Sequence, residues 1–121
     1  MKTLFILNDA PYGTERSYNG LRLARALAKQ SKQSPLAEQQ VQVFLMGDAI
    51  ACAKAGQKVP EGYYNAGDMV KMVGAVGEVG LCGTCMAARG IEDSEVVPGA
   101  MRRTLNDLAE WTANADKILV F

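Results

Sequence analysis

Two cysteines separated by two residues are the strongest chemical signal in this sequence: Cys82-Gly83-Thr84-Cys85. Thiols at this spacing can close a short disulfide or pass a sulfur atom between them. A thiolate at the end of a strand is also stabilised by the amide N–H dipoles of the turn that follows it. Free cysteines are often small buried hydrophobic residues instead, but the glycine and threonine between these two favour a functional pair.

The composition excludes most other kinds of chemistry. The 121 residues contain no histidine, which rules out Ser-His-Asp triads, Cys-His dyads and histidine-ligated metals. A tetrahedral zinc site needs four ligands, and the chain has three cysteines in all. Thirteen basic residues balance thirteen acidic ones, so neither a nucleic acid nor an anionic membrane is indicated as a partner. We therefore expect no metal and no organic cofactor.

The cysteine count and the apolar runs indicate a cellular compartment. An odd number of cysteines fits a secreted disulfide scaffold poorly. The apolar run within residues 1–7 is too short for a signal peptide, and no stretch approaches the roughly 18–20 apolar residues of a membrane span. We expect a cytoplasmic protein with reduced thiols and no membrane partner.

Predicted strands and helices alternate along the chain and must position the cysteine pair. Continuous apolar runs predict strands over residues 3–7, 41–46, 79–81 and 117–121. Helical periodicity predicts helices over about 14–32 with Thr14 as N-cap, over 49–55, over 65–76 with Asn65 as N-cap, and around Met101, Leu105, Leu108 and Thr112. The inward positions of the helix over 65–76 are expected to be Met69, Met72 and Val73. Connections are expected over 34–40, 57–64, 86–90 and 92–99.

This alternation, with strands that are apolar on both faces, is typical of an α/β protein. We predict a three-layer sandwich in which helices flank a mainly parallel, roughly five-stranded sheet. No repeat or linker divides the chain, so residues 1–121 are expected to form a single domain.

In an open parallel sheet, functional residues gather beyond the carboxyl ends of the strands. Loops 8–13, 47–48 and 82–85 are predicted to reach that edge. Cys82 and Cys85 are the candidate reactive residues, and six further residues are expected to line their site: Asn8, Tyr12, Asp48, Gly83, Thr84 and Arg89. Asn8 and Asp48 can equally be caps of turns or helices, and Arg89 can be a solvated surface residue. Cys52 lies in an apolar helical segment and is expected in the core.

Three blocks of residues carry a family resemblance: Asn8-Asp9-Ala10-Pro11-Tyr12-Gly13, Val43-Phe44-Leu45-Met46-Gly47-Asp48, and Leu81-Cys82-Gly83-Thr84-Cys85 followed by Arg89-Gly90. In these blocks the chain resembles the DsrE/DsrF-like family, and in particular its YchN-type members. Segments 19–24, 56–63 and 111–119 match as well, so the resemblance covers essentially the whole chain.

The resemblance implies a small α/β sandwich that assembles into trimers or hexamers. Some members are subunits of sulfur-relay complexes, in which one cysteine carries a persulfide and hands it onward. That cysteine precedes an Arg-Gly pair at the spacing of Cys82 before Arg89-Gly90, so the resemblance implies that Cys82 carries the persulfide. Cys85 has no counterpart in the relay pattern, although YchN-type chains look similar in having one. Relay subunits work in hetero-complexes, whereas the likeness to YchN-type members implies a homo-oligomer.

Two functional hypotheses follow. In the first, Cys82 accepts sulfane sulfur from a donor protein or a small persulfide, Cys85 is the resolving thiol, and an acceptor protein takes the sulfur. Whether such a carrier is a sulfurtransferase-type enzyme is left open. In the second, the protein is a non-catalytic homotrimer or hexamer that binds a small ligand or senses redox state through its cysteine pair.

Overall fold

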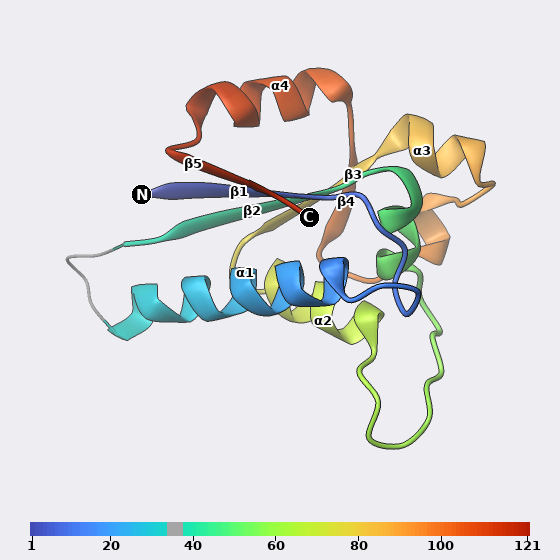
Figure 1. Cartoon of the computed structure of the whole chain (residues 1–121). Coiled ribbons are helices and arrows are strands. Elements are labelled where there is room, and N and C mark those ends of the chain that lie inside the picture. Colours follow the sequence, from blue (N-terminus) through green and yellow to red (C-terminus); the bar gives the residue numbers. More distant parts are fainter. Residues whose placement is uncertain (34–37) are drawn as a thin grey trace.

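A parallel sheet runs through the centre of the molecule (Figure 1). The computed structural model describes residues 1–33 and 38–121, and within them the sheet has five strands in the order β4-β3-β2-β1-β5. Every neighbouring pair of strands is parallel. The strands are β1 (Lys2–Leu7), β2 (Gln40–Leu45), β3 (Glu78–Cys82), β4 (Ala100–Arg103) and β5 (Lys117–Val120).

Helices cover both faces of this sheet (Figure 1). Helices α1 (Arg16–Gln33) and α2 (Ala66–Gly74) pack on one face, and α4 (Leu105–Asn114) packs on the other. Three shorter helices follow the carboxyl ends of strands or connect elements: η2 (Gly47–Ala53), α3 (Gly83–Ala88) and η3 (Asp93–Glu95). The predicted three-layer α/β sandwich with a parallel sheet is confirmed.

The core lies where the central strands meet the two helical layers. Leu4 and Phe5 of β1 and Phe44 and Leu45 of β2 are fully buried, because a strand covered on both faces can be apolar at every position. The edge strand β5 is less covered, and 64% of Val120 is exposed. Apolar burial in the middle of the sheet therefore holds the strand ends in place.

The largest difference from the prediction is at β4. The helix predicted around Met101 begins only at Leu105, and Met101 lies in an edge strand with 61% of its surface exposed. Thr104 caps α4: its hydroxyl accepts the N–H of Asp107, whose carboxylate accepts the N–H of Thr104. A four-residue edge strand with two arginines has no continuous apolar run, so its pattern could not distinguish it from the start of the helix.

The predicted turn over 86–90 was also wrong, because Gly83–Ala88 forms helix α3. Six residues contain too few apolar positions to show helical periodicity, although alanine and methionine favour helix. In α2, Val73 is buried as predicted and Met69 packs against the core, but 42% of Met72 is exposed. The other buried positions of the helix are Ala66, Gly67 and Val70.

The helix caps were predicted with mixed success. Asn65 caps α2 as predicted, since its side-chain oxygen accepts the N–H of Asp68. Helix α1 begins at Arg16, two residues after Thr14, whose hydroxyl still accepts the Arg16 N–H at 3.4 Å. Of the predicted connection over 34–40, residues 34–37 lie outside the described residues.

The turn between α2 and β3 approaches β2 closely at Gly77. A Cβ atom added to Gly77 would lie 2.5 Å from the carbonyl oxygen of Val41. This contact is with backbone, which cannot rotate away as a flexible side chain could.

We expect Gly77→Ala to lower the free energy of unfolding by about 1–3 kcal/mol, because the added methyl group forces β2 and β3 apart at their start. Gly13→Ala is the matched control, since a Cβ there meets nothing within 4 Å. Urea unfolding of both variants measures the effect. Equal stabilities would contradict the close approach at Gly77.

Candidate functional site

The cysteine pair lies at the carboxyl end of β3, where the strand passes directly into α3. Cys82 is the last residue of β3, and Cys85 lies in the first turn of α3. Both thiols are reduced, and their side chains lie close enough to interact. Cys82 is 7% exposed, whereas Cys85 is half-buried. Of these two neighbouring thiols, Cys85 is therefore the more accessible to solvent.

The environment of Cys82 favours the neutral thiol. Burial raises the pKa of Cys82 above its usual value, and the neighbouring Cys85 side chain raises it further. The backbone N–H groups of Cys85 and Thr84 act in the opposite direction, as predicted for amides at a strand end, but burial outweighs them. Cys82 is therefore protonated near neutral pH.

Cys85 has a hydrogen-bond donor of its own. The N–H of Gly47 donates to Cys85 Sγ, with the nitrogen 3.2 Å from the sulfur. Gly47 begins η2 directly after β2 and has a φ of +57°, a left-handed conformation that glycine adopts without strain. The sequence indicated only a turn at Gly47, because the contact joins residues that are distant in the chain.

Asp48 and Arg89 lie beside Cys85, as the sequence predicted. Arg89 donates to Asp48 Oδ1 through Nη2 at 2.8 Å and Nε at 3.2 Å, and its Nη1 donates to the carbonyl of Cys85 at 3.0 Å. The Asp48 side chain is 71% exposed, so the ion pair contributes at most about 1 kcal/mol to stability. Its structural effect is to join the end of α3 to the start of η2 across Cys85.

Two arginines of β4 lie close to the pair and were not predicted as site residues. Arg102 donates to the carbonyl of Gly83 at 3.2 Å and to Asp93 at 2.9 Å. Arg103 is opposite Cys82 in the β3–β4 register, and its guanidinium lies over Trp111, 5.6 Å from the ring centre. No sequence signal could have found them, since their position depends on a strand that was predicted as helix.

Three of the remaining predicted residues lie at the same edge of the sheet. Asn8 follows β1, donates to the carbonyl of Phe121, and has its own carbonyl oxygen against Gly47. Gly83 and Thr84 belong to the first turn of α3, and Thr84 is exposed.

The structure places Tyr12 elsewhere, which corrects its prediction as a lining residue. Tyr12 has a φ of +72°, and its N–H donates to the hydroxyl of Tyr64 at 2.9 Å. Its own hydroxyl donates to Gln57 and accepts the N–H of Ala66. These partners hold Tyr12 on the side of α1 and α2, where the loop before α2 extends away from the sheet (Figure 1).

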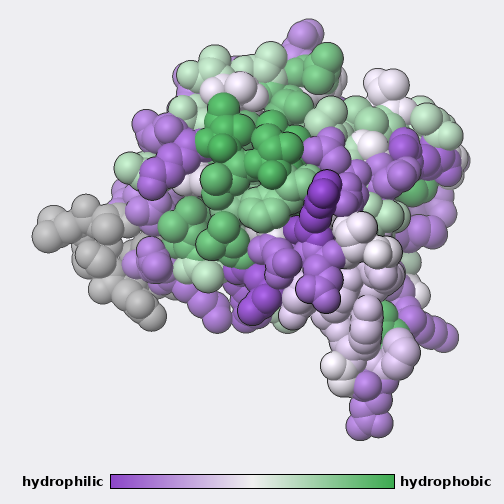
Figure 2. Space-filling model, viewed as in Figure 1, coloured by the Kyte–Doolittle hydropathy of each residue, from purple (hydrophilic) through white to green (hydrophobic). Residues whose placement is uncertain are grey.

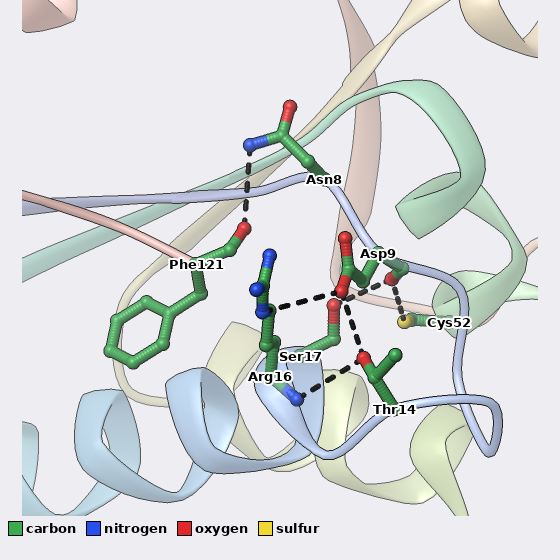
Figure 3. A network of polar contacts seen from close by, with 7 residues as sticks. All are labelled: Asn8, Asp9, Thr14, Arg16, Ser17, Cys52 and Phe121. Carbon is green, nitrogen blue, oxygen red and sulfur yellow. Dashed lines mark hydrogen bonds and ion pairs between the residues drawn. The ribbon is translucent and has the colours of Figure 1, made fainter.

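A second polar network follows β1 and includes Cys52 (Figure 3). The Asp9 carboxylate accepts the Thr14 hydroxyl at 2.8 Å and lies 3.8 Å from Arg16 Nε. The Asp9 carbonyl accepts the Ser17 hydroxyl at 2.6 Å and faces the Cys52 thiol at 3.8 Å. These contacts attach the loop after β1 to α1 and η2. The network therefore stabilises the fold.

Cys52 is a core residue, as predicted. It is fully buried, and this burial raises the pKa of its thiol to about 11. Within residues 1–33 and 38–121, no group of three or more cysteine, aspartate or glutamate side chains could hold a metal ion. In the same part of the chain no helix is both long and apolar enough to cross a membrane.

The raised pKa of Cys52 predicts a loss of stability in alkali. The thiol of Cys52 has a pKa of 9.0 in the unfolded chain and of about 11 in the folded protein. Burying the neutral thiol therefore stabilises the fold fully below pH 9, and this stabilisation is lost as the pH rises to about 11. Over this range the free energy of unfolding falls by about 3 kcal/mol. Urea unfolding of the protein and of Cys52→Ala across this range measures it. The stability difference between the two should shrink by that amount, and a constant difference would contradict the burial of Cys52.

Comparisons with known proteins agree with this architecture. The model of the DsrE/DsrF-like family matches residues 1–121. Protein YchN of Escherichia coli (strain K12) is 41% identical over 121 residues, which covers 99% of this chain and 98% of that protein. An uncharacterized protein, MJ0989 of Methanocaldococcus jannaschii, is 31% identical over 124 residues and is matched over its full length.

Solved structures give the same result. The crystal structure of the YchN protein from E. coli superimposes with a TM-score of 0.90 at 40% identity, over 100% of this chain and 99% of that one. The protein of unknown function MTH1491 from Methanobacterium thermoautotrophicum has a TM-score of 0.68 at 12% identity, over 98% and 97% of the two chains, and shares the fold alone. Matched along its whole length in both sequence and structure, this chain belongs to the DsrE/DsrF-like family.

Proposed function

We propose that the protein carries sulfane sulfur as a persulfide on its cysteine pair. The observation that supports this most is the contact between two reduced thiols of unequal exposure at the functional edge of the sheet. Membership of the DsrE/DsrF-like family supports a sulfur-relay role as well. Such a relay needs no organic cofactor and no metal, because the sulfur–sulfur bond is itself the reactive group.

In this proposal Cys82 bears the persulfide and Cys85 is the resolving thiol. The burial of Cys82 would shelter a terminal sulfur from solvent and from stray thiols. Cys85, within hydrogen-bonding distance, can then attack that sulfur as a thiolate and release the Cys82 thiol. A reducing cytoplasm would keep both residues as thiols between rounds of transfer.

A protein or small-molecule donor and acceptor must approach over the exposed side chains around the pair. Thr84 and Asp48 are exposed there, and Arg89 joins Asp48 to the backbone of Cys85. These polar groups can bind a partner reversibly through hydrogen bonds, as transient docking requires. The chemistry therefore supports a carrier that acts between other proteins.

We also infer that the chain assembles with itself, as a homotrimer or hexamer. Figure 2 shows hydrophobic side chains gathered over β5, between α4 and α1. Ile118 and Val120 of this edge strand are 41% and 64% exposed, and Leu105 of α4 is exposed as well. A net charge of zero gives little repulsion between copies, so an apolar strand edge of this kind favours contact with a second copy.

The alternative is a redox sensor in which the same two thiols close a reversible disulfide. It is favoured by the same contact between the thiols and requires no donor or acceptor of sulfur. The two functions differ in what becomes attached to the protein, and one experiment separates them.

Intact-protein mass spectrometry after incubation with a persulfide donor tests the relay. We expect the protein to gain the mass of one sulfur atom, to lose it on reduction, and to gain none in the double variant Cys82→Ser/Cys85→Ser. Cys52→Ser is the matched control and should gain sulfur like the unaltered protein, because Cys52 is fully buried. A mass loss of two hydrogens in place of the sulfur adduct would favour the redox sensor.

Sedimentation velocity tests the assembly. The protein should sediment as a trimer or hexamer at micromolar concentration, and Val120→Glu should dissociate it by placing a charge in an apolar contact. Val76→Glu makes the same change at an exposed valine of the turn after α2 and should leave the assembly intact. A monomeric unaltered protein would overturn the inference.

A further inference from the structure

The two thiols of the pair differ in how a reactant can reach them. Cys82 ends β3 with 7% of its surface exposed, while Cys85 is half-buried on the first turn of α3. An attacking thiolate must approach the sulfur–sulfur bond of a donor in line, so it needs open space beyond its own sulfur. The geometry provides that space more readily at Cys85 than at Cys82.

Polar contacts also hold Cys85 in a defined position. The Gly47 N–H points at Cys85 Sγ from 3.2 Å, and the Arg89 guanidinium donates to the carbonyl of Cys85 itself. These two contacts fix the sulfur and the backbone of Cys85 next to the exposed Thr84. At Cys82, by contrast, burial raises the pKa of the thiol.

Resting on the relay function proposed above, we propose that Cys85 is the thiol that takes sulfur from the donor and that Cys82 receives it from Cys85. The donor class is a persulfide, R–S–SH, of a small thiol or of a protein cysteine. In this scheme Cys85 accepts sulfur from the donor and later passes it to the acceptor, and Cys82 holds the sulfur between these two steps.

Each step conserves atoms and electrons. In the first, the Cys85 thiolate attacks the terminal sulfur of R–S–SH, the donor's sulfur–sulfur bond breaks, and R–S⁻ leaves with the electron pair. In the second, Cys82 attacks the terminal sulfur of the Cys85 persulfide, a new bond forms to Cys82, and the Cys85 thiolate leaves. The proton of the Cys82 thiol passes to the departing Cys85 thiolate, so the number of protons is unchanged. No oxidant or reductant is consumed, because a thiol replaces a thiol at each transfer.

The rate of sulfur uptake by single-cysteine variants tests this order. With glutathione persulfide as the probe, Cys82→Ser should load at about the rate of the unaltered protein, whereas Cys85→Ser should load at least about tenfold more slowly. The stored sulfur should also be lost faster from Cys82→Ser, since it then stays on the exposed thiol. Cys52→Ser serves as the control for an unrelated thiol. Fast loading of Cys85→Ser together with slow loading of Cys82→Ser would overturn the proposal.

Alkylation of the unaltered protein gives a second readout that needs no sulfur transfer. Iodoacetamide should modify Cys85 before Cys82, and fragmentation of the tryptic peptide over 72–89 distinguishes the two sites. Modification of Cys82 first would overturn the assignment whatever the variants do. If no variant gains sulfur while Cys85 is still alkylated first, the relay function fails and its loading step with it, and only the order of thiol reactivity stands.

Discussion

The parallel pairing of β2 with β3 is the constraint on which the site depends. Leu45 of β2 lies opposite Leu81 of β3, so the two strands end at the same level of the sheet. This register brings Gly47, which follows β2, to the sulfur of Cys85, which follows β3. A slip of one residue would turn every side chain of the strand to the other face and would separate this donor from the thiol. The buried residues of both strands are what prevent that slip.

Around this register, the site has a buried and an accessible half. Cys82 belongs to the sheet and shares its burial, while Cys85 belongs to a short helix tied to η2 by the Arg89–Asp48 ion pair. In the proposed relay, a sulfur atom on Cys82 would be shielded from solvent and one on Cys85 would be accessible. Two chemically identical thiols thus differ in accessibility because different elements carry them.

Much of the fold was predictable, for reasons that differ between elements. The central strands were predicted because they contain runs that are apolar on both faces, and Asn65 was predicted as a cap because its side chain acts within its own turn. Strand β4 was missed because an edge strand of four residues with two arginines has no pattern of its own. Met72 was predicted as an inward position of its helix, but 42% of it is exposed in the folded chain.

The sequence by itself determined the chemistry available: three thiols and no imidazole, with two of the thiols close enough in the chain to meet. It also determined the alternation of strands and helices that places Cys82 and Cys85 at the edge where parallel strands end. Only the tertiary structure decided which thiol is buried, which receives the Gly47 N–H, and that Arg102 and Arg103 lie beside them while Tyr12 does not. The reason is physical: residue types and local spacing act within one element, whereas burial and these contacts arise between strands and helices that are distant in the chain.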